Sequence, residues 1–312
     1  DNNQKKYVES KPNVIQKISG VAGSGKTTIA ALRAAISASN KKKVLVLCYN
    51  ITIKNYLIDE VEKTIYPQNE LIDFFHFHDF CKAYREVNNI SYQTEILNEE
   101  SDDNSIEEIK KHKVQNKDTS INYDVIIIDE GQDFKKNWYE LIKNFLKPNG
   151  EILIALDQKQ NIYNREKKIS LKGIGGGRWG ILKKSYRLLN PHIKLANKFS
   201  EKFFLDVNEE NEDPKIELDE NNQFKLPFKP EPASFWLNIL NDNDLNDSVV
   251  GILKDLFDNK VSPSDIAILV TNHDQGRNLK KIIIENYENI KIMDIFDKLY
   301  VRQRQQKILF KV

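Results

Sequence analysis

Residues 14–28 read Val-Ile-Gln-Lys-Ile-Ser-Gly-Val-Ala-Gly-Ser-Gly-Lys-Thr-Thr, and the rest of the chain is organised around them. Four of these residues fit the phosphate-binding pattern G-x-x-x-x-G-K-[ST]: Gly20, Gly25, Lys26 and Thr27. The apolar run before the pattern predicts a buried strand, and the alanine-rich run after it predicts a helix. A strand, a glycine loop and a helix N-terminus together make an anion site, since backbone N–H groups and the helix dipole favour negative charge.

The residue types inside this loop match the chemistry of a nucleotide phosphate. Glycines at 20, 23 and 25 permit positive φ and a close approach of phosphate to the backbone. Lys26 would reach the β- and γ-phosphates, and the Thr27 hydroxyl would hold Mg²⁺. A chance glycine turn is the alternative, and the flanking strand and helix argue against it.

Composition limits the class of protein. A chain of 312 residues with 40% hydrophobic residues can form two domains with cores of their own. The net charge of +1 gives no overall electrostatic indication of nucleic acid, so any basic surface must be local. Cys48 and Cys81 lie in apolar surroundings, which predicts reduced thiols and a cytoplasmic protein. No apolar run reaches the length of a membrane span, and we expect the chain to be a segment of a longer protein.

A second motif begins at Tyr123 and reads Tyr-Asp-Val-Ile-Ile-Ile-Asp-Glu-Gly-Gln-Asp, an apolar strand that ends in two acids. An aspartate at a strand end beside a phosphate loop can bind Mg²⁺, here Asp129. The adjacent Glu130 can polarise the water that attacks the γ-phosphate. An acidic turn at a strand end is the alternative.

Other runs predict further elements. Apolar runs predict strands at 44–49, 71–77, 151–156, 265–270 and 290–293, and periodic runs predict helices at 51–63, 190–204, 249–257 and 275–287. Residues 88–122 are polar and predict a solvated insertion, either a small helical subdomain or a mobile loop. Its lysine cluster (Lys110, Lys111, Lys113) could contact a phosphate backbone, and two histidines, His76 and His78, invite a metal interpretation for which the sequence offers no third ligand nearby.

Taken together, the motifs resemble those of the UvrD/Rep-like superfamily 1 DNA helicases. The resemblance rests on Gln4, on residues 20–28 (motif I), on residues 44–50 (motif Ia) and on His76-Phe-His-Asp-Phe80. It rests further on Asp129-Glu-Gly-Gln-Asp133 (motif II), on residues 157–163 (motif III) and on Ser185-Tyr-Arg187 (motif IV). It implies an α/β P-loop NTPase with two RecA-like parallel-sheet lobes. The first lobe would span residues 1–175, with a small polar insertion at about 88–122, and the second residues 176–312.

The resemblance also implies roles for single residues, with ATP and Mg²⁺ as cofactors. Catalysis would depend on Lys26, Glu130, Gln160 and Arg187. Nucleotide binding would involve Gln4, Gly23, Ser24, Gly25, Lys26, Thr27, Thr28 and Tyr186. Mg²⁺ would be held by Thr27 and Asp129. Gln132 and Gln160 would couple the γ-phosphate to DNA contacts, and Arg187 would reach the γ-phosphate from the second lobe.

DNA contacts would come from Tyr49, Phe77 and Tyr163, because aromatic faces stack on bases without reading their sequence. For Phe77 and Tyr163 an ordinary place in the core is an equal alternative. The sequence departs from the family after Tyr163, where Asn164-Arg-Glu166 replaces the usual Trp-Arg-Gly, and motifs V and VI do not occur in it.

These observations predict an ATP-dependent helicase or translocase that moves on single-stranded or partly duplex DNA. A second hypothesis is an ATP-binding regulatory or assembly module that controls a nuclease or another protein partner without unwinding. A third is RNA unwinding, since backbone tracking and stacking do not require a deoxyribose. None of the three involves a membrane.

Overall fold

The computed structural model describes residues 2–9, 11, 14–64, 69–91, 99–116, 121–157, 179–203, 216–217, 242–270, 272–287, 290 and 292. The chain divides into two compact units, one formed by the residues up to Pro232 and the other by Ala233–Ile308. Each unit is described by itself. The unit that contains the phosphate loop also holds the large sheet.

The first unit is built on a six-stranded sheet with strand order β3-β2-β4-β5-β1-β6. All recorded pairings between its strands are parallel. The strands are β1 (Ile15–Gly20), β2 (Val44–Cys48), β3 (Ile72–His76), β4 (Tyr123–Ile128), β5 (Leu146–Leu156) and β6 (Gly180–Leu182). Buried parallel strands are expected to be continuously apolar, as β2 and most of β4 are, because helices cover both faces. The predicted α/β fold class is confirmed.

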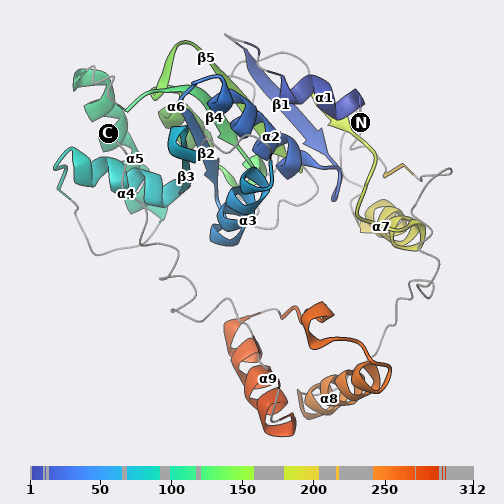
Figure 1. The fold of residues 1–312 in the computed structure, drawn as a ribbon. Coiled ribbons are helices and arrows are strands. Elements are labelled where there is room, and N and C mark those ends of the chain that lie inside the picture. Colours follow the sequence, from blue (N-terminus) through green and yellow to red (C-terminus); the bar gives the residue numbers. More distant parts are fainter. Residues whose placement is uncertain are drawn as a thin grey trace. The chain divides into compact units, whose positions relative to one another are not determined.

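Helices pack on both faces of this sheet (Figure 1). One group comprises α1 (Asn2–Val8), α2 (Lys26–Ser39) and α3 (Ile51–Glu62), and the other comprises α4 (Phe77–Val87), α5 (Glu99–Asn116) and α6 (Lys136–Lys143). The alternation of side chains along β3 separates the groups, because Ile72 belongs to the α2–α3 core while Phe75 meets Phe80 of α4, with ring centroids 5.7 Å apart. A further helix, α7, spans Asn190–Phe203.

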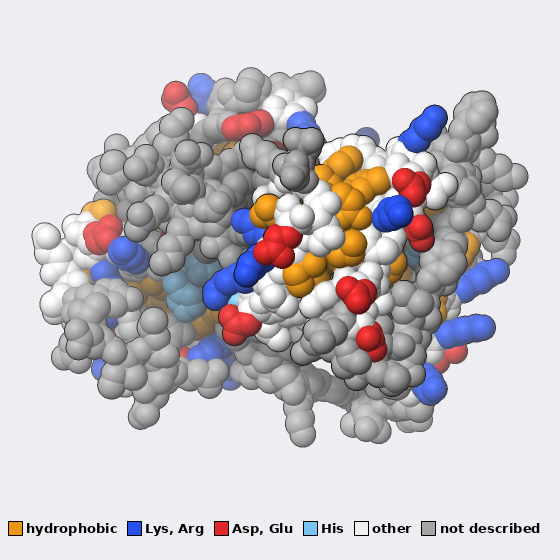
Figure 2. All heavy atoms as spheres, turned by 90° about the horizontal axis from the view of Figure 1, so that it is seen from below, with side chains coloured by type: hydrophobic (Ala, Val, Ile, Leu, Met, Phe, Trp, Pro, Cys, Tyr) orange, Lys and Arg blue, Asp and Glu red, His pale blue; other side chains and the backbone are white. Residues whose placement is uncertain are grey.

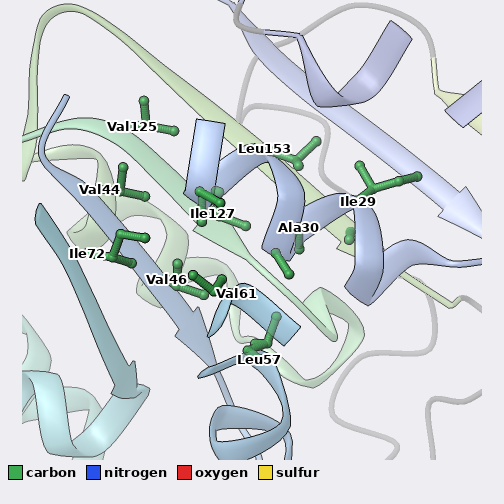
Figure 3. Packing of buried hydrophobic residues seen from close by; sticks show 14 of the residues in the cluster. Ile29, Ala30, Val44, Val46, Leu57, Val61, Ile72, Val125, Ile127 and Leu153 are labelled. Carbon is green, nitrogen blue, oxygen red and sulfur yellow. The ribbon is translucent and has the colours of Figure 1, made fainter. Parts of the chain in front are cut away.

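The core beneath α2 and α3 fixes the start of α2 against the sheet. Small side chains on α2 let the helix approach the strands closely, and larger ones fill the space between them. Figure 3 shows this packing, with residues from α2, α3 and four strands: Ile29, Ala30, Val44, Val46, Leu57, Val61, Ile72, Val125, Ile127 and Leu153. All of these side chains are at most 5% exposed. The helix that begins with Lys26 is therefore held rigidly relative to the strand ends.

In the insertion the structure takes the helical alternative, since α5 packs on α4 and α6. Arg85 of α4 is buried and donates to Ser105 O at 3.0 Å and to Glu108 at 2.8 Å. Lys113 is also buried and donates to Ile121 O at 3.1 Å, so the contact with a phosphate backbone that the sequence left open is not available to this lysine. The side chain is buried, and its ammonium group is hydrogen-bonded to a backbone carbonyl at the end of the insertion.

The second unit contains α8 (Asp242–Asp258) and α9 (His273–Asn286), which pack on each other. Among the described residues of this unit, the buried hydrophobic side chains are Leu253, Leu279 and Ile283. The expected strand at 265–270 does not form: after a 3-10 turn at Pro263–Asp265, residues 266–270 have no strand partner among the described residues, and Leu269 is 95% exposed. A strand needs a neighbour to satisfy its backbone groups. Residues 290–293 lie partly outside the described residues.

On the face viewed in Figure 2, hydrophobic side chains lie together, with acidic and basic side chains around them.

Candidate nucleotide-binding site

The phosphate loop links β1 to α2 at the carboxyl edge of the sheet, where open α/β sheets bind ligands. Gly23 and Gly25 have φ values of +74° and +85°, in the left-handed region that glycine adopts without steric cost. At Gly23 space requires glycine as well, because a Cβ there would lie 2.6 Å from Arg187 Cβ. The loop thus opens directly onto the N-terminus of a well-packed helix, which is the arrangement that binds phosphate.

Lys26 is the first residue of α2, and its ammonium group is held inside the phosphate loop. Its Nζ donates to Gly20 O at 2.7 Å and to Val21 O at 3.2 Å. The same atom is 3.4 Å from Asp157 Oδ2, just past the end of β5. A buried charge needs such partners. The lysine is therefore pre-positioned over the loop that would receive phosphate.

Asp129 follows β4 and is fully buried. By hydrogen-bond geometry neither carboxylate oxygen has a partner among the described residues, although Thr27 and the Glu130 backbone lie near enough to lower its pKa. Burial, and then the charge of Glu130, outweigh them and raise the pKa of Asp129. An unpaired carboxylate beside a threonine hydroxyl fits Mg²⁺, which prefers hard oxygen ligands. Thr27 and Asp129 therefore fit the magnesium site that the sequence predicts.

Glu130 is held by a strained backbone and by one amide. Its φ of 52° and ψ of 46° are left-handed, which is uncommon for a residue with a side chain and concentrates at functional sites. Gln132 Nε2 donates to Glu130 Oε2 at 2.6 Å, and Gln132 Oε1 accepts from Asp157 N at 2.9 Å. Gln132 thereby ties the carboxylate to the end of β5, whose Asp157 contacts Lys26.

A pocket of about 170 Å³ lies beside the loop. Its lining comes from α1, the phosphate loop, β6, the segment after β6 and the bridge partner of Lys184: Gln4, Ser24, Ile181, Leu182, Lys183, Lys184, Tyr186 and Glu217. Gln4 Nε2 donates to Ser24 O at 2.8 Å. This hydrogen bond to the phosphate loop fixes the orientation of the Gln4 amide, including its oxygen. We call this cavity the base pocket, because its position next to the phosphate site suits the base of a nucleotide.

The segment Ser185–Arg187 packs directly on the phosphate loop. Tyr186 N donates to Gly23 O at 2.8 Å, and a Cβ on Gly23 would lie 2.6 Å from Arg187 Cβ. This segment belongs to the same compact unit as the loop, whereas the sequence led us to expect it at the start of a second lobe. Arg187 is exposed, so its guanidinium can reach toward the loop without breaking the core.

Two of the predicted DNA-stacking residues, Tyr49 and Phe77, differ in how deeply they are buried. Tyr49 is half-buried at the end of β2, where its ring centroid lies 5.8 Å from that of Trp138. Phe77 is fully buried and stacks on Trp138 at 4.1 Å, so the structure gives it the core position that the sequence left open. We call Tyr49, His76, Phe77, His78 and Trp138 the aromatic cluster.

The remaining predicted residues have plain outcomes. Thr28 is exposed in the first turn of α2. Gln160 and Tyr163 lie outside the described residues. In the part of the chain that the structure describes, no group of three potential metal-binding side chains of the His, Cys, Asp or Glu type occurs. Among those residues no helix has both the length and the apolar character needed to cross a membrane.

Sequence reasoning missed a buried ion pair near the site. Arg33 of α2 and Glu151 of β5 are at most 1% exposed, with Arg33 Nη2 2.7 Å from Glu151 Oε2. Burial lowers the pKa of Arg33, and the carboxylate of Glu151 opposes that shift. The available indication was a single arginine within the alanine-rich stretch Ala30-Ala-Leu-Arg-Ala-Ala35.

Comparison with known proteins gives one family. A family model described as an AAA domain matches residues 4–166, slightly more than half of the chain. The match covers Gln4, the phosphate loop and the acidic strand end at Asp129 and Glu130. No curated protein matches the sequence.

Proposed function

The chain belongs to the AAA domain family of P-loop nucleotide-binding proteins, and from this premise we propose that it is an ATP-driven motor that moves on single-stranded DNA. The proposal has two parts. The first is that the site binds ATP with Mg²⁺, and the second is that ATP hydrolysis is coupled to movement on DNA. The single observation that carries the first part is the base pocket beside the phosphate loop.

The base pocket favours adenine. Gln4 presents an amide, and an amide can accept from the adenine N6 amino group while donating to N7. Guanine carries an acceptor at the corresponding exocyclic position, so the amide cannot make the same pair. Tyr186 lines the same pocket and offers a ring on which a base can stack.

The phosphate side supports hydrolysis. Mg²⁺, when bound, supplies charge neutralisation for the β- and γ-phosphates. Lys26 would add a positive charge to the transferring phosphate, and Glu130, oriented by Gln132, would polarise the attacking water. Arg187, exposed next to Gly23, could stabilise charge in the transition state, an interaction worth about 10³–10⁵ in rate in enzymes that use it.

The coupling to DNA is supported by the neighbouring strand. Tyr49 follows β2, which pairs with β4, and Asp129 N donates to Leu47 O at 2.9 Å. The half-buried ring therefore lies at the end of the strand next to the one that Asp129 and Glu130 follow. A shift of Asp129 and Glu130 at the end of β4 would therefore move Tyr49 and any base stacked on it. Tyr163 remains a further candidate for stacking.

The test is steady-state ATP hydrolysis by the longest natural chain, with and without single-stranded DNA, together with Glu130→Gln. Strong stimulation by DNA that disappears in the variant would support the motor. ATP binding without DNA-dependent turnover would favour the regulatory or assembly module and a protein partner such as a nuclease. Stimulation by single-stranded RNA in place of DNA would change the assigned track.

A further inference from the structure

The helix that carries Gln4 is attached to the helix that carries Lys26 through one side chain. Arg33 Nη1 donates to Tyr7 O at 2.9 Å and also to Glu9 O, at the C-terminal end of α1. The last carbonyls of a helix have no partner within the helix, and the helix dipole favours a cation at this end. Arg33 is thus a cap for α1 that is supplied by α2.

The cap is itself fixed on its far side. Arg33 Nη1 also donates to Gln16 Oε1 of β1 at 2.9 Å, and its Nη2 bonds Glu151 of β5. Glu151 Oε2 accepts in addition from Lys11 N at 2.5 Å, in the segment that follows α1. One buried guanidinium and one buried carboxylate therefore link α1, α2, β1 and β5. A planar group with several fixed donors suits this task better than an ammonium group.

The position of α1 sets the geometry of the base pocket. Tyr7 of α1 is buried against β6, where a Cβ on Gly180 would lie 2.0 Å from the Tyr7 hydroxyl. The next residues of β6, Ile181 and Leu182, line the base pocket together with Gln4. A displacement of α1 would therefore move Gln4 relative to both Ser24 and β6.

We propose that Arg33, together with Glu151, is a positioning pair that gives the nucleotide site its preference for adenine by holding Gln4 in place. The proposal rests on the nucleotide-binding part of the proposed function and not on hydrolysis or DNA. It assigns to a buried ion pair a task that is distinct from global stability. Buried pairs of this kind add little net stability compared with apolar residues of the same volume, which leaves room for a specific role.

The experiment measures the affinity of the full chain for fluorescent methylanthraniloyl derivatives of ATP and GTP, which report binding without hydrolysis. In Arg33→Met combined with Glu151→Gln, both charges are removed together, so no buried charge is left unpaired. We expect the ATP affinity to fall about tenfold, the effect of losing one well-placed hydrogen bond, while the GTP affinity changes less than about twofold. Arg33→Lys should recover part of the preference.

Gln4→Ala tests whether the pair acts through the amide. If it does, Gln4→Ala should lose the ATP preference by itself, and adding the Arg33 and Glu151 changes should cost little more. Effects that multiply in the combined variant would overturn the proposal, because the ion pair would then act independently of Gln4. Arg33→Lys alone, which keeps a cation beside Glu151, is the milder variant if the double change does not fold. A loss of affinity equal for both nucleotides would overturn the proposal.

Arg85→Met is the matched control, since Arg85 is also a buried guanidinium that donates to carbonyls and a glutamate, but between α4 and α5. It should leave the ratio of ATP to GTP affinity unchanged, and a changed ratio would show that any lost buried arginine has this effect. A wild-type chain that binds both nucleotides equally would also overturn the proposal. A chain that prefers ATP but does not hydrolyse it would refute only the motor.

Discussion

At the β4, β5, β1 and β6 end of the sheet, buried polar atoms such as both Asp129 oxygens and Ser24 Oγ lack partners among the described residues, whereas at the β2–β3 end aromatic rings pack on one another. Both regions lie at the carboxyl edge of the same sheet. A buried polar group without a partner costs free energy, and Asp129 and Ser24 lie beside the phosphate loop, where a nucleotide with Mg²⁺ would supply partners. Phe77 and Trp138 stack on each other, so these two ring faces are not available to stack on a ligand.

The largest effect should come from the polar end. Lys26→Ala should abolish ATP hydrolysis, because it removes the charge that neutralises the transferring phosphate. Steady-state phosphate release measures this, and Lys82→Ala, at an exposed lysine of α4, is the control. Turnover at the wild-type rate in Lys26→Ala would remove the phosphate loop from the active site.

The second effect concerns Glu130, which should be needed for the chemical step but not for binding. Glu130→Gln should lower the rate by about 10²–10⁴, the range expected for a general base, while ATP still binds. The amide can keep a hydrogen bond to Gln132, so the backbone should be undisturbed. Glu140→Gln on α6 is the control, and a parallel loss of ATP affinity in Glu130→Gln would indicate a binding role instead.

The third prediction tests whether Phe77, at the β2–β3 end of the sheet, is a core residue. Phe77→Ala should lower the free energy of unfolding by about 3–5 kcal/mol, since it removes a fully buried ring that stacks on Trp138. Urea unfolding gives the value. Unchanged stability accompanied by weaker binding of single-stranded DNA would return Phe77 to the DNA surface.

The smallest effect should appear at the boundary of the aromatic cluster. Tyr49→Ala should weaken single-stranded DNA binding by about 1–3 kcal/mol, the value for one stacked base, and leave basal ATP hydrolysis intact. Fluorescence anisotropy with a labelled oligonucleotide measures this change. Tyr56→Ala is the matched control, because Tyr56 of α3 is 44% exposed and lies outside the cluster. Equal DNA affinity in both variants would leave the aromatic cluster without a role in binding.

Much of the first unit followed from local pattern. The strands at 44–48 and 123–128 and the helix after Lys26 formed within a few residues of their predicted bounds, because apolar runs between turn residues favour buried parallel strands. Among the described residues the expected strand at 265–270 has no partner, and no local pattern contains that information, since a strand requires a paired neighbour. The phosphate contact that the sequence left open for Lys113 is lost for a similar reason, because this lysine is buried with its ammonium group over the Phe145 ring, which its charge does not indicate.

The sequence alone determined the phosphate loop and the acidic strand end, because their spacing, glycines and flanking periodicity are local properties of the chain. Only the tertiary structure decided which distant residues complete the site. Ser185–Arg187 lies on Gly23, Gln4 bonds the loop through α1, and Arg33 meets Glu151 across 118 residues of sequence. These contacts depend on strand order and helix packing, which bring together residues whose sequence separation carries no indication that they meet.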